Sequence, residues 1–399
     1  MAVKDADVAI VGAGAWGASA LWRLAERGVK AIAFDAQTVP NVYGSTHGHT
    51  RLFRVACHEH ADLTPVARRA RDLWRELEAK QDADLLRQSG LLSIGPEGGR
   101  AIRNGTSATK LAGVKVTKLT IEELRERYPQ HANLGDNYVG LLDHEAGYVR
   151  AEHAMRATAA QARAVGGTLF EGTKVLDVVE DGDGVLVRTA DRDFRVGQVI
   201  LSGGAWMSKM QDIVDLKPVR APLFWWEPKA NRQNPEEFSI ENFPAFIRHW
   251  DDENTMWGHG YTPEAPVKLG ASYDRNARMY VDPDKVLRGV RPLVDWKTLA
   301  DVLPTAVPGL EPTPVVAQPC LITESPDGQF VIGRHPDRPR IVMAGGCHGH
   351  GFKHAPAIGE LLAQITLDEE VFTDIEFMRP DRFRRAGANI PSQPVATQV

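Results

Sequence analysis

The stretch Asp7-Val-Ala-Ile-Val-Gly-Ala-Gly-Ala-Trp-Gly17 decides the fold class of this chain. Its short β-branched apolar run has the pattern of a buried parallel strand, and the glycines follow that run directly. Apolar residues then recur at helical spacing as far as Gly28, and a second apolar run over 29–34 ends in Asp35. Strand, glycine turn, helix and strand in this order predict a βαβ unit of about 30 residues.

The glycines of this unit also predict a binding site for a dinucleotide. Gly12 makes the tight turn, Gly14 leaves room for the pyrophosphate at the positive helix N-terminus, and Gly17 lets helix and strand pack. Asp35 can accept both ribose hydroxyls, and its negative charge disfavours the 2′-phosphate of NADP. The motif alone leaves NAD and FAD open, and a glycine-rich turn without a ligand is the simpler alternative.

Length and composition are those of an ordinary globular protein. The chain has 399 residues, enough for two domains, and 47 Lys and Arg against 52 Asp and Glu give a net charge of -5, which argues against a nucleic-acid binder. Three cysteines cannot form a disulfide framework, and no stretch is long enough to span a membrane, so a cytoplasmic protein is predicted. Zinc spacings, a P-loop and a GxSxG elbow do not occur, which excludes metallohydrolases, NTPases and α/β-hydrolases.

Beyond the first unit, the chain changes character twice. Residues 63–79 and 151–166 are spaced as helices, whereas the region 219–318 is richer in aromatics, prolines and strand-like runs. This region holds five of the nine tryptophans, which more often build a core than a ligand cage. Strands at 329–332 and 340–344 then return the chain to α/β character.

A second glycine-rich segment, Gly345-Gly-Cys-His-Gly-His-Gly351, opens a helix that starts near Phe352. The positive end of this helix can face a ligand held by the first unit, and if that ligand is a flavin, it stabilises negative charge on the reduced ring. His350 and Lys353 would then stand beside the ring. A loop with two exposed histidines is the alternative.

Several single residues have both a functional and a plain interpretation. Arg51 and Arg54 are three apart, so in a helical turn they share a face and suit a carboxylate; solvated surface arginines are the alternative. On its own, Cys320 in an apolar run is most simply a small buried hydrophobe, and Lys268 a solvated strand residue.

Together, these motifs resemble those of the monomeric sarcosine oxidase and N-methyltryptophan oxidase family. The matching motifs span nearly the whole chain in the family's order. They are Val11-Gly-Ala-Gly14, Gly44-Ser-Thr-His-Gly-His-Thr-Arg51-Leu-Phe-Arg54, Leu73-Trp74, Lys268-Leu-Gly270, Cys320 with the run Thr323-Glu-Ser-Pro-Asp327 after it, and Gly349-His-Gly-Phe-Lys353.

The resemblance implies a flavoenzyme of the D-amino-acid-oxidase-like superfamily, with FAD joined to Cys320 by a thioether from the flavin 8α-methyl group. It implies that Arg54 and Lys353 hold a substrate carboxylate, that Lys268 activates oxygen above the flavin, and that His350 lines the site. A lysine cation stabilises the negative charge that develops as oxygen is reduced, and an arginine with a lysine can orient an amino acid toward the flavin.

The residues implied in this way form three sets. The catalytic set is Lys268, His350, Arg51 and Trp257, and the substrate-binding set is Arg54 and Lys353. The cofactor-binding set is Gly12, Gly14, Gly17, Asp35, Ser45, Thr46, Thr50, Arg51, Cys320, Gly349, Gly351, Phe352 and Lys353.

The chain departs from the family pattern at three places. His49 stands where the family usually has Asp, Trp257 replaces a tyrosine, and Ser272, with Tyr273 adjacent, stands where a histidine is expected. These residues would contact the amine or side-chain end of a ligand, so they concern the substrate more than the cofactor. An amino acid or N-methyl amino acid is therefore expected, rather than sarcosine in particular.

The sequence thus predicts an α/β (α+β) fold with a Rossmann-like FAD-binding domain and a second, β-rich substrate domain. The FAD-binding domain is expected from residues 1–85, 145–218 and 319–385, the substrate domain from 86–144 and 219–318, and a C-terminal tail from 386–399.

The expected activity is oxidation of the C–N bond of a sarcosine-like or N-methyltryptophan-like amino acid. A hydride passes to FAD, an imine forms, and O2 is reduced to H2O2; the partners are the amino acid and O2, and the resemblance favours a monomer. The alternatives are an FAD-dependent dehydrogenase or oxidase of a primary or cyclic amino acid that uses another electron acceptor, an NAD-dependent dehydrogenase, and a non-catalytic dinucleotide-binding module.

Overall fold

Strand β1 (Ala6–Val11) lies inside an eight-stranded sheet in the computed structural model, which describes residues 4–231, 234–251, 254–272, 279–292 and 294–385. On one side it pairs in parallel with β2 (Ala31–Phe34), as the βαβ pattern predicts, and on the other with β12 (Asp193–Leu201), a strand from a distant stretch of the chain. The other strands of this first sheet are β9 (Thr168–Phe170), β10 (Val175–Asp181), β11 (Gly184–Thr189), β20 (Val331–Arg334) and β21 (Ile341–Gly345).

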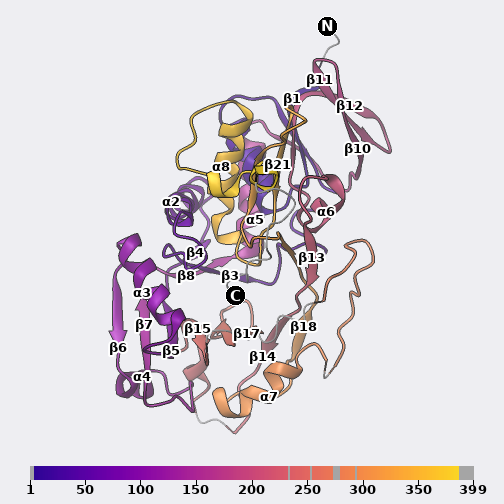
Figure 1. Cartoon of the computed structure of the whole chain (residues 1–399). Helices are drawn as coiled ribbons and strands as arrows, with labels where there is room; N and C mark the ends of the chain where they lie inside the picture. Colours follow the sequence, from indigo (N-terminus) through magenta and orange to yellow (C-terminus); the bar gives the residue numbers. More distant parts are fainter. Residues whose placement is uncertain (1–3, 232–233, 252–253, 273–278, 293, 386–399) are drawn as a thin grey trace.

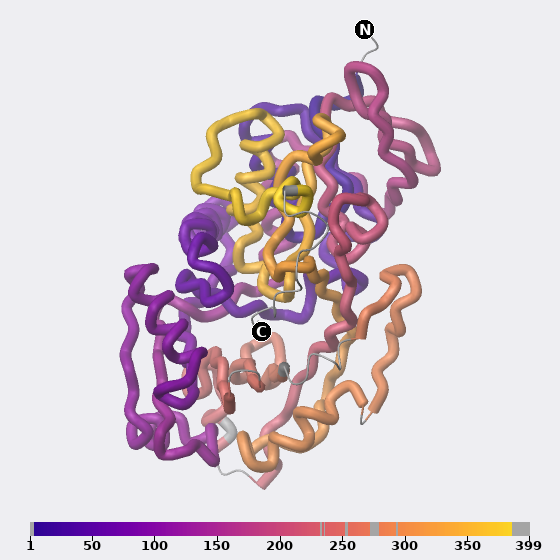
Figure 2. The backbone as a smooth tube through the Cα atoms, in the orientation of Figure 1, coloured from indigo at the N-terminus to yellow at the C-terminus, as the bar shows by residue number. Residues whose placement is uncertain are grey.

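Helices from both ends of the chain cover the first sheet. Helix α1 (Ala15–Ala25) packs against α8 (Ala355–Thr366) and α5 (Ala151–Ala164), and α8 also contacts α2 (Leu63–Gln81). Figure 2 shows the yellow C-terminal segment beside the indigo N-terminal one. Helices α1 and α8 approach closely at Gly359, where a Cβ would lie only 2.4 Å from Ser19.

A second eight-stranded sheet lies below the first in Figure 1. Its strand order is β18 (Val316–Gln318), β14 (Leu223–Trp226), β17 (Val267–Ser272), β16 (Thr255–His259), β15 (Ala245–His249), β5 (Leu91–Pro96), β7 (Tyr138–Asp143) and β6 (Val116–Leu119). The helices beside it are α3 (Arg100–Ala112), α4 (Ile121–Arg127) and α7 (Lys297–Ala306). Strands from two distant stretches of chain therefore build one sheet around an aromatic core.

The remaining strands form two small sheets. One has the order β3 (Thr50–Phe53), β8 (Gly147–Arg150) and β4 (Leu86–Arg87), and the other pairs β13 (Lys217–Arg220) with β19 (Leu321–Glu324). Short helical segments are η1 (Gly204–Trp206), α6 (Met207–Met210), η2 (Pro235–Phe238), η4 (Phe352–His354), η5 (Glu376–Met378) and α9 (Arg382–Arg385). Strand β3 lies between the two large sheets in Figure 1 and carries part of the Gly44–Arg54 motif.

The structure confirms the α/β class with a second, β-rich region. The helix expected over 63–79 is observed as Leu63–Gln81, and the strand expected over 329–332 begins later, at Val331. The domain limits stay a prediction, and the tail 386–399 and Tyr273 lie outside the described residues. Within the described ranges, every helix is too short or too polar to cross a membrane.

Candidate active site

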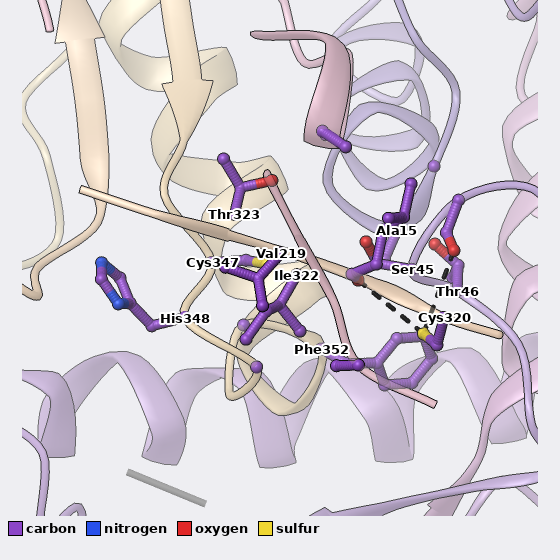
Figure 3. A pocket seen from close by; sticks show the side chains of 18 of the residues that line it. Ala15, Ser45, Thr46, Val219, Cys320, Ile322, Thr323, Cys347, His348 and Phe352 are labelled. Atoms are coloured by element: carbon purple, nitrogen blue, oxygen red, sulfur yellow. Dashed lines mark hydrogen bonds between the residues drawn. The ribbon is translucent and has the colours of Figure 1, made fainter. Parts of the chain in front are cut away.

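A cavity of about 830 Å³ receives residues from both large sheets and from the small sheets. Except for Gly17, all the predicted site residues line its wall. They are Gly12, Gly14, Asp35, Ser45, Thr46, Thr50, Arg51, Arg54, Trp257, Lys268, Cys320, Gly349, His350, Gly351, Phe352 and Lys353. Figure 3 shows part of this wall, with Cys320 beside Ser45 and Thr46 and with His348 farther away.

The three N-terminal glycines have different surroundings. Gly12 has φ +94°, and a Cβ there would lie 2.6 Å from the Ser202 carbonyl oxygen. A Cβ at Gly17 would lie 1.9 Å from the Gly12 carbonyl oxygen, so Gly17 serves the packing of α1 on β1. At Gly14, a Cβ would meet only the Thr46 Oγ1, at 3.6 Å. Gly14 therefore keeps space open in the cavity at the start of α1, where a ligand phosphate can approach.

Asp35 stands where β2 ends, beside the glycine turn. Its carboxylate accepts a hydrogen bond from the Ala13 N–H at 2.9 Å and another from the Gln37 N–H at 2.9 Å. Burial raises the pKa of Asp35, although these two N–H groups oppose the change. The turn and the acid are thus held together as a ribose site requires.

Cys320 differs chemically from the other two cysteines. It is 4% exposed, and its Sγ lies 3.8 Å from Arg51 Nη2. Burial alone would raise the thiol pKa, but the His47 imidazole and the cations Arg51 and Lys268 lower it to about 7. Burial instead raises the pKa of Cys347, and it raises that of Cys57 to about 12. Cys320 is therefore the cysteine with thiolate character near neutral pH.

Lys268 is a buried cation held by backbone oxygens. Its Nζ donates to the carbonyls of Gly48 at 2.7 Å and Thr50 at 2.9 Å, and it lies 5.3 Å from the centre of the Trp225 ring. Burial, followed by the charge of Arg51, holds the pKa of Lys268 well below its usual range. In the ammonium form, with two hydrogens engaged, one N–H remains for a group in the cavity.

At another part of the wall, Arg54 and Lys353 share a buried carboxylate. Arg54 Nη2 and Lys353 Nζ donate to Glu59 Oε1 at 2.7 and 2.9 Å. Burial would raise the pKa of Glu59, but the two cations hold it well below its usual range. The His350 Nδ1 lies 4.0 Å from Glu59 Oε1, and burial keeps the His350 pKa well below its usual range. Two cations against one anion leave a net positive charge for an incoming anion.

The arginine pair does not lie on a helix as the spacing had suggested. Residues 50–53 form strand β3, in which successive side chains alternate between faces. Arg51 donates to the Thr50 and Ser45 carbonyls and faces Cys320, whereas Arg54 pairs with Glu59. The helical turn on which a shared face depended is therefore not observed, and the two arginines lie at different parts of one cavity.

The tryptophans of region 219–318 divide between core and cavity. Trp225 and Trp226 are 1% and 0% exposed, in agreement with the expected core role. Trp257 is half-buried, lines the cavity, and lies so close to Gly270 that a Cβ there would be 2.1 Å from its ring. Trp257 thus contributes a flat apolar wall beside Lys268.

Comparisons with known proteins show the family to which the chain belongs. The family model described as FAD dependent oxidoreductase (DAO) matches residues 7–365. The monomeric sarcosine oxidase of Bacillus sp. (strain B-0618) is 30% identical over 383 residues, covering 94% of this chain and 96% of the relative. This chain belongs to the DAO family of FAD-dependent oxidoreductases. The N-methyl-L-tryptophan oxidase of Escherichia coli O139:H28 (strain E24377A / ETEC) is 27% identical over 380 residues, covering 95% of this chain and 99% of the relative.

Solved structures share the fold of this oxidoreductase. NikD, an unusual amino acid oxidase essential for nikkomycin biosynthesis, has a TM-score of 0.81 at 24% identity, with 95% of this chain and 98% of that chain covered. The L-proline dehydrogenase from P. horikoshii has a TM-score of 0.80 at 19% identity, with 96% and 99% covered.

The cavity of this oxidoreductase fits FAD in several respects. The space at Gly14 and the carboxylate of Asp35 suit the pyrophosphate and ribose. Both ring nitrogens of His350 are buried without a hydrogen-bond partner in the described structure, so they suit polar groups of a ligand. The N-terminal side of α8 also reaches the wall, through Gly351 and Phe352.

Replacing Gly14 with alanine should lower FAD binding without weakening the fold. The added Cβ has room against the protein but occupies space at the helix start, so we expect the flavin-to-protein absorbance ratio to fall about tenfold. Thermal unfolding of the flavin-free protein should stay as in the wild type. The matched variant Gly17→Ala should lower the unfolding temperature, because its Cβ would overlap the Gly12 carbonyl. Normal flavin content in Gly14→Ala would contradict this assignment.

Some residues important to the site escaped the sequence-based prediction. Glu59 and His259 line the cavity, and His47 contributes to the thiol pKa of Cys320. The only local signal was an acid or histidine close to a predicted residue, since Glu59 follows Arg54 by five positions and His259 follows Trp257 by two. His259 also lies opposite Lys268 in the pairing of β16 with β17, which the sequence does not reveal.

Proposed function

We propose that this enzyme oxidises the C–N bond of a secondary or N-methyl amino acid and uses O2 as the electron acceptor. The observation that supports this proposal most directly is the placement of an anion site and a buried lysine in one cavity. Arg54 and Lys353 offer net positive charge after Glu59 is counted, and Lys268 keeps one N–H for the cavity. The curated relatives named as oxidases of sarcosine and N-methyl-L-tryptophan support the substrate class.

FAD, when bound, accepts the hydride of the substrate C–H and returns electrons to O2. In total, two electrons and two protons leave the CH–NH unit, an imine forms, O2 becomes H2O2, and water then hydrolyses the imine. Arg54 and Lys353 would bind and orient the carboxylate, and Trp257 would exclude water beside it. His350 stays neutral because burial lowers its pKa, so one of its ring nitrogens can accept a hydrogen bond. The Lys268 ammonium would stabilise negative charge developing on oxygen.

The function is tested with purified enzyme and a panel of sarcosine, N-methyl-L-tryptophan, L-proline and glycine. Anaerobic loss of the flavin absorbance identifies a substrate, and oxygen uptake with H2O2 formation in air identifies the acceptor. Bleaching together with rapid oxygen uptake is expected for an N-methyl or secondary amino acid. Bleaching without oxygen uptake would make the enzyme a dehydrogenase, and the absence of bleaching with every amino acid would overturn the proposal.

Replacing Arg54 with methionine should weaken binding of the carboxylate. Since one charge-assisted contact is lost, kcat/KM for the free amino acid should fall about 30-fold, mostly through KM. The wild type should prefer the free acid over its methyl ester, and Arg54→Met should narrow this preference. Arg75→Met, which removes an exposed cation paired with Glu78 on α2, serves as the control. An unchanged preference for the acid would contradict the assignment.

We also propose a location, an oligomeric state and domain limits for this protein. The three cysteines are free thiols, as a reducing compartment requires, so a cytoplasmic location stays our prediction. We also propose a monomer, which light scattering after size-exclusion chromatography would measure. The FAD-binding domain is proposed to comprise 1–85, 145–218 and 319–385, because these segments supply the strands of the first sheet.

A further inference from the structure

His259 is a buried histidine that has no role in the proposed chemistry described above. It is 2% exposed and lines the cavity at the end of β16, where it pairs with Lys268 of β17. Its Nδ1 is 2.6 Å from the Gly260 carbonyl oxygen, and its Nε2 is 2.6 Å from Thr50 Oγ1. The ring also stacks on Tyr148, with centroids 5.7 Å apart and an angle of 13°.

These contacts determine the protonation of the imidazole. A carbonyl oxygen can only accept, so Nδ1 must carry the hydrogen that it donates to Gly260. Burial, followed by the charge of Lys268, lowers the pKa of His259 to about 3, so the ring is neutral and Nε2 has no hydrogen. The Thr50 hydroxyl must therefore donate to His259 Nε2.

Thr50 contacts both Lys268 and Arg51 through its main chain. Its carbonyl oxygen accepts from Lys268 Nζ at 2.9 Å and from Arg51 Nη1 at 2.8 Å. The neighbouring Gly48 carbonyl accepts from Lys268 at 2.7 Å and from the Thr50 N–H at 2.7 Å. Lys268 therefore holds the main chain of residues 48–50, while His259, on the strand next to that of Lys268, holds the side chain of Thr50.

We propose that His259 is a positioning residue for the reaction with oxygen, acting through Thr50 on the placement of the Lys268 ammonium. This inference rests on the proposed role of Lys268. The remaining N–H of Lys268 is directed into the cavity only while the Thr50 carbonyl stays in place. The hydrogen bond from Thr50 to His259 holds Thr50 against the second large sheet. The neutral ring adds no charge of its own, so its effect is geometric.

The test uses the FAD-loaded protein, reduced by light and EDTA so that no amino-acid substrate is needed, and then mixed with oxygen. His259→Phe keeps the stacking on Tyr148 but removes both ring hydrogen bonds, and we expect reoxidation to slow about tenfold. His259→Gln, whose side-chain oxygen can accept from Thr50, should restore most of the rate. His131→Phe is the matched control, because His131 is a buried histidine packed against Phe243 and Phe246 outside this cavity.

A double-mutant cycle asks whether His259 acts through Thr50. Thr50→Val should slow reoxidation about as much as His259→Phe, and the double variant should be no slower than either single variant. Additive effects, or a wild-type rate in His259→Phe, would overturn the inference.

A second readout does not depend on turnover. In nitrogen NMR spectra of histidine-labelled protein, the His259 signals, assigned by their loss in His259→Phe, should show Nδ1–H and no titration between about pH 6 and 9. An Nε2–H form or a titrating ring would overturn the inference. Wild-type reoxidation no faster than that of free FAD would instead overturn the oxidase function, while the NMR result would still report on the His259–Thr50 contact.

Discussion

Replacing Cys320 with serine is expected to release all flavin from the protein on acid precipitation, whereas the wild type should give a yellow pellet. Attachment would form a bond between Cys320 Sγ and the 8α carbon of FAD, while the thiol hydrogen and one methyl hydrogen leave as protons. The two electrons released would reduce the flavin, and O2 would then take them and become H2O2. The thiolate is the reactive form, and Cys320 has it in quantity because its thiol pKa is lowered to about 7. Serine lacks an anion at this pH, so the covalent bond should be lost completely.

Attachment of the flavin to Cys320 should become faster as pH rises. A pKa lowered from 9.0 to about 7 means that the thiolate forms as pH rises through about 7. Attachment of added FAD to flavin-free protein should therefore be slow at pH 5.5 and fast at pH 8. Protein-bound absorbance after precipitation measures its progress with time.

Cys347 supplies the matched control, because it also lines the cavity but burial raises its thiol pKa. Cys347→Ser should keep a yellow pellet. A yellow pellet from Cys320→Ser would assign the attachment to another residue, and a white pellet from the wild type would mean that FAD is held without a covalent bond. Neither result would affect the family membership.

Replacing Lys268 with methionine should slow reoxidation of the reduced flavin by about 100-fold or more. The substitution keeps the length of the side chain but removes a buried positive charge where negative charge develops on oxygen, and such a charge is strongest in a site without water. Reduction by substrate should change less than about threefold, because the carboxylate site that we propose at Arg54 and Lys353 lies elsewhere in the cavity. Stopped-flow measurement of the two half-reactions separates these effects.

The wild-type rate should also depend on pH. Burial and Arg51 lower the pKa of Lys268, so the ammonium is present at low pH and is lost as pH rises through a value below 10.5. The reoxidation rate of the wild type should therefore fall as rising pH removes the ammonium proton, and the rate of Lys268→Met should stay constant over the same pH values. Lys209→Met, which removes an exposed cation paired with Asp282 and Asp284, controls for surface charge. Equal slowing of both half-reactions in Lys268→Met would contradict the role in oxygen activation.

Contiguous sequence was enough for the features that depend on neighbouring residues. The glycine turn, α1 and the parallel pairing of β1 with β2 follow from one stretch of chain, because backbone sterics and side-chain periodicity act over a few residues. Helix α2 was expected within two residues of its observed end for the same reason. The identity of the cofactor required more, namely several motifs in one order along the chain.

The tertiary structure decided which of these residues meet. Thr50, Lys268 and Cys320 come from β3, β17 and the residue before β19, so only the packing of three sheets brings them to one wall. The same packing makes β3 extended rather than helical, which separates Arg51 from Arg54. It also places Glu59 between two cations and His259 against Thr50. Such contacts join positions up to 294 residues apart, and their free energy comes from burial and charge pairing that local periodicity does not encode.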